Sequence, residues 1–226
     1  MKSKVRAERD NTMTISGRIF AVCVCLLSVS HAHAQQAPDQ KAMFGSYVNS
    51  DVYKAFLERV FNLGEPAAMK AGCPALKVIE SSRTIILEQP TFVRAGANYN
   101  IDTGVWVGTE LMDRCGAKVM RRALLKAIPG ANNLQPTLLL PGDFPGNLKL
   151  EADAKRIVIP GLMGLAKCSD MSKFQMHDIR ALTPAAAAGW SETWLAEACG
   201  AKVEAEVTYA ATGDGMNVTA RNWKLR

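Results

Sequence analysis

Two stretches of the chain are near copies of each other: WVGTELMDRCGAKV at residues 106–119 and WSETWLAEACGAKV at residues 190–203. Aligned without a gap, they agree at eight of fourteen positions and share the pentapeptide Cys-Gly-Ala-Lys-Val. Agreement of this extent indicates an internal duplication, and the prediction of the fold starts from it. The repeated stretch contains no recognisable reaction chemistry, so it predicts architecture and not activity.

The first 34 residues have the pattern of a secretory signal peptide. Five basic side chains lead, an almost unbroken apolar run follows at 19–29, and Ala-His-Ala at 32–34 supplies the small residues of a cleavage site. The apolar run is too short to cross a bilayer, which takes about 20 residues. We therefore expect an exported protein whose mature chain starts near Gln35 and has no membrane span; Met13 is an alternative start of the precursor.

Removal of the leader changes the charge of the chain. The 27 basic and 21 acidic side chains fall to 22 and 19, so the net charge drops from +6 to +3. No run of lysine and arginine of the nucleic-acid-binding type remains, and export also argues against nucleic acid as a partner. The expected partner is an envelope component or another protein of the periplasm.

Four cysteines follow the leader: Cys73, Cys115, Cys168 and Cys199. An even number in an exported chain predicts two disulfides, with three connectivities to choose from. Each Cys-Gly copy has one cysteine upstream in its own half, so the simplest pairing is Cys73–Cys115 and Cys168–Cys199. A zinc site of all four is the alternative, but the short ligand spacings that pre-form one are missing. With His177 as the only histidine after the leader, we expect no metal and no cofactor.

Both halves predict the same order of elements. Apolar spacing predicts a helix over 51–62, capped by Ser50, and another over 150–166, which the Pro-Gly pair at 160–161 is expected to kink or split. Strands are predicted after each helix, on either side of the Cys-Gly turns, at 76–79, 83–93, 105–112, 118–126, 137–140, 174–182, 190–195, 203–209 and 216–220.

The fold class that follows is α+β, with two pseudo-repeats that each place a helix before an antiparallel sheet of three to four strands. Pro-Gly-Asp at 141–143 and Pro-Gly-Asn at 145–147 are consecutive turn signals and mark the internal boundary. We therefore assign the first repeat to 35–148 and the second to 149–226.

The candidate ligand-binding residues are Trp106, Trp190, Glu192 and Trp194. On a strand, Trp190, Glu192 and Trp194 lie on one face because side chains alternate. Two indoles beside a carboxylate can stack on a sugar and accept its hydroxyl hydrogens. The alternative is that the tryptophans are core residues and Glu192 pairs with a cross-strand base, since aromatic residues favour strands in any case.

No catalytic residue is identified. There is no Gly-x-Ser-x-Gly nucleophile motif, and His177 and Asp178 are expected on opposite faces of a strand. Glu204 and Glu206 are expected on the solvated face of theirs. The Arg-Arg pair at 121–122 is expected among exposed edge charges.

The segment 189–194, Gly-Trp-Ser-Glu-Thr-Trp, together with the later Cys-Gly at 199–200, resembles the C-terminal modules of a group of small secreted proteins of Gram-negative bacteria. Leu-Leu-Leu-Pro-Gly at 138–142 is also similar to that group. The resemblance implies a periplasmic or secreted location and a shared fold, and it implies no activity. The first repeat departs from the module at Gly108 and Glu110.

Three hypotheses for function follow. The first is a non-catalytic periplasmic protein that binds a ligand or partner through a sheet face or the groove between the repeats. The second is a carboxylate-dependent hydrolase of envelope glycans, with Glu192 facing a second carboxylate across a cleft. The third is a structural assembly subunit that uses an exposed sheet edge. The first is preferred because no catalytic constellation is present.

Overall fold

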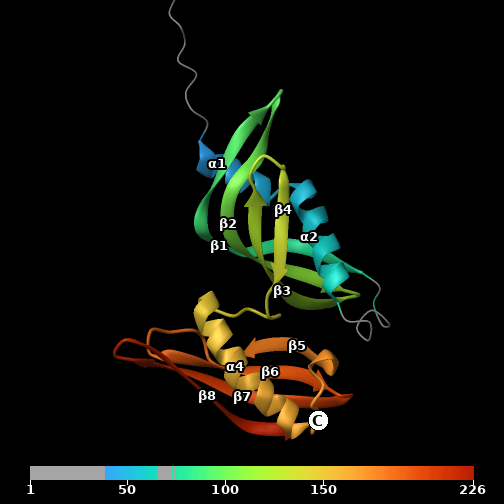
Figure 1. The fold of residues 1–226 in the computed structure, drawn as a ribbon, viewed down its shortest axis with the longest axis vertical. Helices are drawn as coiled ribbons and strands as arrows, with labels where there is room; N and C mark the ends of the chain where they lie inside the picture. The colour runs from blue at the N-terminus through green and yellow to red at the C-terminus, as the bar shows by residue number, and fades with distance from the viewer. Residues whose placement is uncertain (1–38, 66–72, 74) are drawn as a thin grey trace, which may run out of the picture. The chain divides into compact units, whose positions relative to one another are not determined.

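The computed structural model describes residues 39–65, 73 and 75–226, and the predicted signal peptide lies outside them. From Asp39 onward these residues belong to one compact unit. It contains two halves of the same type, each with a helix ahead of a four-stranded antiparallel sheet (Figure 1). The predicted α+β fold of two pseudo-repeats is confirmed.

The first half begins with two helices, α1 (Gln40–Val48) and α2 (Asp51–Gly64). Ser50 caps α2 as predicted, because its hydroxyl accepts a hydrogen bond from the Tyr53 N–H at 3.2 Å. Helix α1 is not predicted by the sequence, since its apolar residues follow no helical stripe. The sheet of the first half has the strand order β1-β2-β3-β4. These strands are Leu76–Ala95, Asn98–Arg114, Ala117–Ile128 and Asn133–Leu138.

The core of the first half lies between α2 and this sheet. Leu57 and Phe61, one turn apart on α2, pack with Trp106 and Leu125 of the sheet, and each of these four side chains is almost wholly buried. Strand β1 is longer than predicted: the two expected segments join into one strand because several register shifts along it absorb the polar residues between them.

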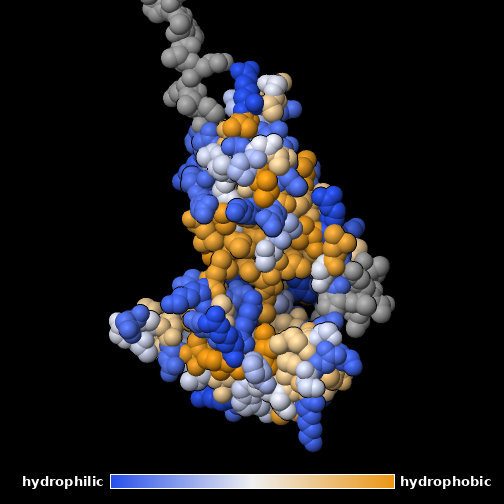
Figure 2. Space-filling model, in the orientation of Figure 1, coloured by the Kyte–Doolittle hydropathy of each residue, from blue (hydrophilic) through white to orange (hydrophobic). Residues whose placement is uncertain are grey.

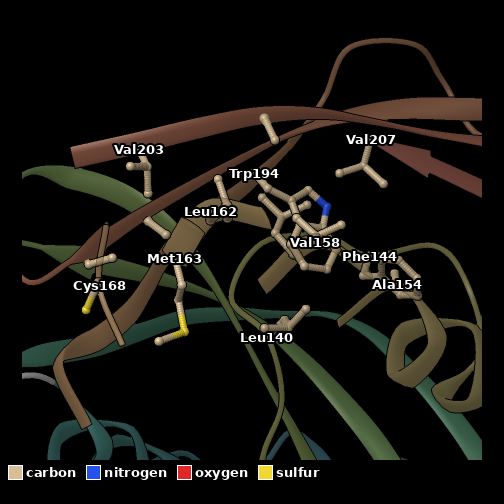
Figure 3. Packing of buried hydrophobic residues seen from close by; sticks show 14 of the residues in the cluster. Leu140, Phe144, Ala154, Val158, Leu162, Met163, Cys168, Trp194, Val203 and Val207 are labelled. Atoms are coloured by element: carbon tan, nitrogen blue, oxygen red, sulfur yellow. The ribbon is translucent and has the colours of Figure 1, made fainter. Parts of the chain in front are cut away.

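The second half contains α4 (Leu148–Leu165) and a sheet of order β5-β6-β7-β8, made of Phe174–Ala181, Gly189–Ala198, Ala201–Thr212 and Gly215–Leu225. A single 3-10 turn, η1 (Met171–Lys173), leads into β5. Figure 3 shows Val158 and Leu162 of α4 against Trp194 and Val207 of the sheet, and all four are fully buried.

Of the two outcomes expected at Pro160 and Gly161, a kink or a split, the split does not occur, since α4 runs through both residues. Val158 and Leu162, on either side of the proline, are fixed in the core, and that packing outweighs one lost backbone hydrogen bond. Gly161 has a packing role: a Cβ there would lie 2.3 Å from the Trp223 ring, so only glycine lets β8 approach the helix this closely. None of the helices in the described ranges is long and apolar enough to cross a membrane.

Candidate functional site

The two Cys-Gly pairs form the turns of equivalent hairpins, β2–β3 and β6–β7. In the first turn Cys115 and Gly116 have φ of 48° and 91°, and in the second Cys199 and Gly200 have φ of 50° and 82°. Positive φ at both central residues is the signature of the type I′ turn, whose twist matches that of the paired strands. Disulfides join Cys73 to Cys115 and Cys168 to Cys199, which confirms the predicted pairing.

Each hairpin places the lysine of the pentapeptide at the start of its second strand. Lys118 lies directly opposite Asp113, and Lys202 lies directly opposite Glu197, so the two repeats match in register as well as in sequence. Both lysine side chains are exposed. Among the described residues, neither lysine forms an ion pair. Asp113 accepts a hydrogen bond from the Gly116 N–H at 2.6 Å, and Glu197 lies 3.9 Å from His177 Nε2.

Both copies of the pentapeptide line one cleft of about 410 Å³. Ala117, Lys118 and Val119 come from the first copy, and Lys202 and Val203 come from the second. The other lining residues are Arg114, His177, Asp178, Arg180, Leu195, Ala196 and Arg226. A cleft of this volume is in the range that holds a small molecule, and the duplication is what builds it from two sides.

The charge of this cleft is positive. Five of its lining residues are lysine or arginine and one is a carboxylate, Asp178. The arginines have carboxylate partners: Arg114 pairs with Glu65, Arg180 with Asp178, and Arg226 with the buried Glu204. Of the five cations that line the cleft, the two pentapeptide lysines are those that form no ion pair with a described residue.

His177 and Asp178 both line the cleft, so the prediction that they face opposite sides of the strand is wrong. The register of β5 against β6 shifts between Met176 and Asp178, which makes His177 the extra residue of a bulge. Burial lowers the pKa of His177, the carboxylate of Glu197 raises it, and Lys202 and two arginines lower it further. The net lowered pKa favours a neutral imidazole beside the lysines at neutral pH.

The tryptophans predicted to bind a ligand occupy different places. Trp106 and Trp194 have no exposed surface, each in the core of its own half. Trp190 is half-buried and stacks on Tyr209, with ring centroids 4.4 Å apart and planes 16° from parallel. The structure brings Trp190, Glu192 and Trp194 together, but it does not bring Trp106 to them.

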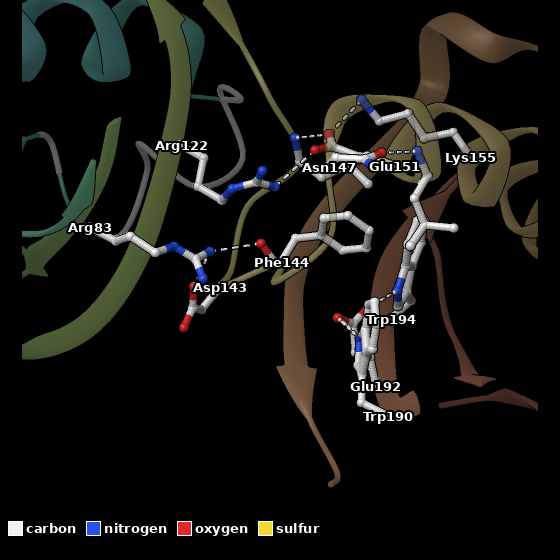
Figure 4. Close-up of polar contacts among 12 residues, drawn as sticks. Arg83, Arg122, Asp143, Phe144, Asn147, Glu151, Lys155, Trp190, Glu192 and Trp194 are labelled. Carbon is white, nitrogen blue, oxygen red and sulfur yellow. Dashed lines mark hydrogen bonds and ion pairs between the residues drawn. The ribbon is translucent and has the colours of Figure 1, made fainter. Parts of the chain in front are cut away.

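Glu192 is buried between the two indoles and does not face a cleft. Its carboxylate accepts hydrogen bonds from Trp190 Nε1 at 2.8 Å and Trp194 Nε1 at 3.0 Å, as Figure 4 shows. Burial raises its pKa, although the indole hydrogen bonds oppose that change. Bound in this way, Glu192 holds the aromatic residues in place and lacks the access to substrate that the hydrolase hypothesis requires.

The first repeat has its own buried carboxyl group, Glu110, at the position of Trp194. One of its oxygens accepts from the Ser81 hydroxyl at 2.7 Å, and the other has no hydrogen-bond partner. Burial raises the pKa of Glu110 from its ordinary 4.5 to about 7, and the hydrogen bond from Ser81 and the charge of Lys54 only partly offset this. Glu110 is thus a titrating group enclosed in the core.

The Arg-Arg pair that the sequence places among exposed charges is buried instead. Arg121 pairs with Glu65 at 2.6 Å, and Arg122 with Glu151 of α4 at 2.9 Å. Figure 4 shows Glu151 also binding the Lys155 ammonium. The same carboxylate accepts a hydrogen bond from the Leu140 N–H at 3.1 Å. Burial alone would raise the pKa of Glu151, but these donors and the Arg122 charge lower it below its usual value.

A smaller cleft of about 290 Å³ lies beside these ion pairs and includes Leu138–Leu140 of the Leu-Leu-Leu-Pro-Gly segment. Its cations, Arg121, Arg122 and Lys155, are all engaged by Glu65 or Glu151. Each of these three cations therefore already has a carboxylate partner within the protein. The cleft built by the two pentapeptides is therefore the better candidate for a ligand site.

Within residues 39–65, 73 and 75–226, no group of histidine, cysteine, aspartate and glutamate side chains has the geometry to hold a metal ion. Comparison of the chain with family models, with curated proteins and with solved structures gives no match.

Proposed function

We propose that this is an exported, non-catalytic binding protein, periplasmic or secreted, that takes its ligand or partner in the cleft lined by both pentapeptides. The observation that carries the proposal is the convergence of Lys118 and Lys202, the same position of the two repeats, on one concave site. Each copy of the pentapeptide belongs to an exposed hairpin, and the two hairpins together line the cleft. A duplication that produces a concave site in this way supports a role in ligand binding.

Export is supported by the pattern of the first 34 residues and by the two disulfides, which form and persist in oxidising compartments. An envelope component or another periplasmic protein is the partner we infer. The enclosure of Glu192 among the indoles that bind it argues against the hydrolase alternative that uses this carboxylate.

The test is ¹H–¹⁵N chemical-shift mapping during titration with a small-molecule extract of a bacterial cell envelope. Saturable shifts are expected at the amides of Lys118 and Lys202. Ala117→Trp, which places bulk at the exposed cleft wall, should abolish them. Ala95→Trp, at the exposed end of β1, is the matched control and should leave them intact. Saturable shifts that leave the cleft amides unmoved, or no saturable shifts at all, would contradict the proposal.

A second candidate, the assembly subunit, is favoured by one observation. Strand β1 is an edge of its sheet and exposes large hydrophobic side chains, of which Ile86 and Leu87 are 43% and 48% exposed. Figure 2 shows hydrophobic side chains gathered on the first half. Such an edge is a template for pairing with another chain. Analytical ultracentrifugation that finds a monomer at high concentration would count against self-assembly through β1.

A further inference from the structure

We propose that the cleft selects a small oxyanion ligand, a compound bearing carboxylate or phosphate groups, through Lys118 and Lys202. This inference rests on the proposed function, since it names the ligand class of the same site. The inference goes beyond the proposed function because a concave site alone does not specify the charge of its ligand.

The first step is the charge balance. Every arginine that lines the cleft has a carboxylate partner within the chain, whereas the two lysines form no ion pair with any described residue. Two ammonium groups that line one concave site repel each other. An anion bound between them would remove that repulsion.

The carboxylates opposite the two lysines do not form ion pairs with them. Asp113 and Glu197 lie opposite the lysines in the hairpin ladders, where a cross-strand ion pair would ordinarily form. Asp113 instead accepts a hydrogen bond from the turn amide of Gly116, and the Glu197 carboxylate lies 3.9 Å from His177 Nε2. The lysines are left as donors for a group from outside the chain.

The third step concerns the form of the ligand. Besides its charged residues, the cleft has an apolar lining of Ala117, Val119, Leu195, Ala196 and Val203. A few charged groups around an apolar surface are typical of sites for small organic molecules. The flexible ammonium of lysine contacts phosphate or carboxylate as a point charge and does not distinguish the two by shape. An organic acid and a phosphate ester therefore share the chemistry that this cleft recognises.

The test is isothermal titration calorimetry at low ionic strength, with citrate and with inorganic pyrophosphate as separate probes. Binding of at least one probe to the wild-type protein is expected. Lys118→Ala and Lys202→Ala should each weaken it by roughly tenfold or more, as expected for loss of a charge-assisted hydrogen bond. Lys149→Ala, an exposed lysine of α4 outside the cleft, is the matched control and should change nothing. Lys202→Arg should retain binding.

Which probe binds more tightly distinguishes an organic acid from a phosphate as the natural group. Both lysines are exposed, so the variants should keep the wild-type circular dichroism and unfolding temperature. If neither probe binds, or if Lys149→Ala weakens binding as much as the cleft variants, the inference is overturned. If a cell-envelope ligand shifts the cleft amides equally in the wild type and in the doubly substituted Lys118→Ala, Lys202→Ala protein, the proposed function stands and the oxyanion inference fails.

Discussion

Replacing Glu110 with glutamine should stabilise the protein at pH 8 and change its stability little at pH 4.5. The buried carboxyl group has a pKa of about 7 in the folded state, against an ordinary value of 4.5. Between these values the folded chain keeps a proton that the unfolded chain releases. The contribution of Glu110 to the free energy of unfolding is therefore fully present below pH 4.5 and is lost as the pH rises to 7.

The size of this loss follows from the two pKa values. A difference of one pKa unit corresponds to about 1.4 kcal/mol, so the wild-type protein should lose about 3 kcal/mol of stability between pH 4.5 and pH 8 through Glu110. The glutamine variant carries a neutral side chain of the same shape at every pH and should not show that loss. Its advantage over the wild type should grow from near zero to about 3 kcal/mol over this range.

The assay is urea unfolding followed by circular dichroism at half-unit pH intervals, with Glu80→Gln as control, since Glu80 is an exposed carboxylate on β1. The control should run parallel to the wild type. Ser81→Ala should move the midpoint of the pH dependence upward, because the Ser81 hydrogen bond lowers the pKa of Glu110. A Glu110→Gln advantage that is the same at pH 4.5 and pH 8 would refute the reasoning.

Two further predictions concern stability. Gly200→Ala should destabilise the protein by about 1 kcal/mol because φ is +82° at this position. Gly45→Ala, in helix α1 and equally free of neighbours, should stabilise it by about 0.5–1 kcal/mol. Equal effects of the two substitutions in thermal unfolding would contradict this prediction. Glu151→Leu should cost about 3–5 kcal/mol because it leaves the buried Arg122 unpaired, whereas Arg122→Met should cost less because Lys155 still pairs with Glu151. The double variant should cost less than the sum of the two single losses; additive losses in urea unfolding would show that the two side chains are not coupled.

The parts of the fold that the sequence predicts are those with local signals. The α2 cap at Ser50, the Cys-Gly turns and the disulfide pairing all follow from residues close together or from the duplication itself. The length of β1 and the continuity of α4 were not predictable in this way. Bulges join the segments of β1, and core packing holds α4 together across Pro160.

The candidate site was harder to predict because it depends on contacts between distant residues. The sequence predicts Arg122 to be a surface charge because its partner, Glu151, lies 29 residues away along the chain. The alternation of polar and apolar residues along its strand predicts that Glu204 is exposed. Glu204 is instead buried and paired with Arg226 and Lys224. One signal for the cleft was present: a lysine repeated at the same position of both copies, which no turn or disulfide requires.

The most direct test of the central claim asks whether the two pentapeptides face each other in a single chain. Treatment with a short amine-reactive cross-linker, isolation of the monomer and peptide mapping should yield a Lys118–Lys202 cross-link. A mixture of ¹⁴N- and ¹⁵N-labelled protein would identify links between molecules, and Lys202→Arg should remove the cross-link. Lys118 joined to other lysines of the same chain but never to Lys202 would contradict the cleft.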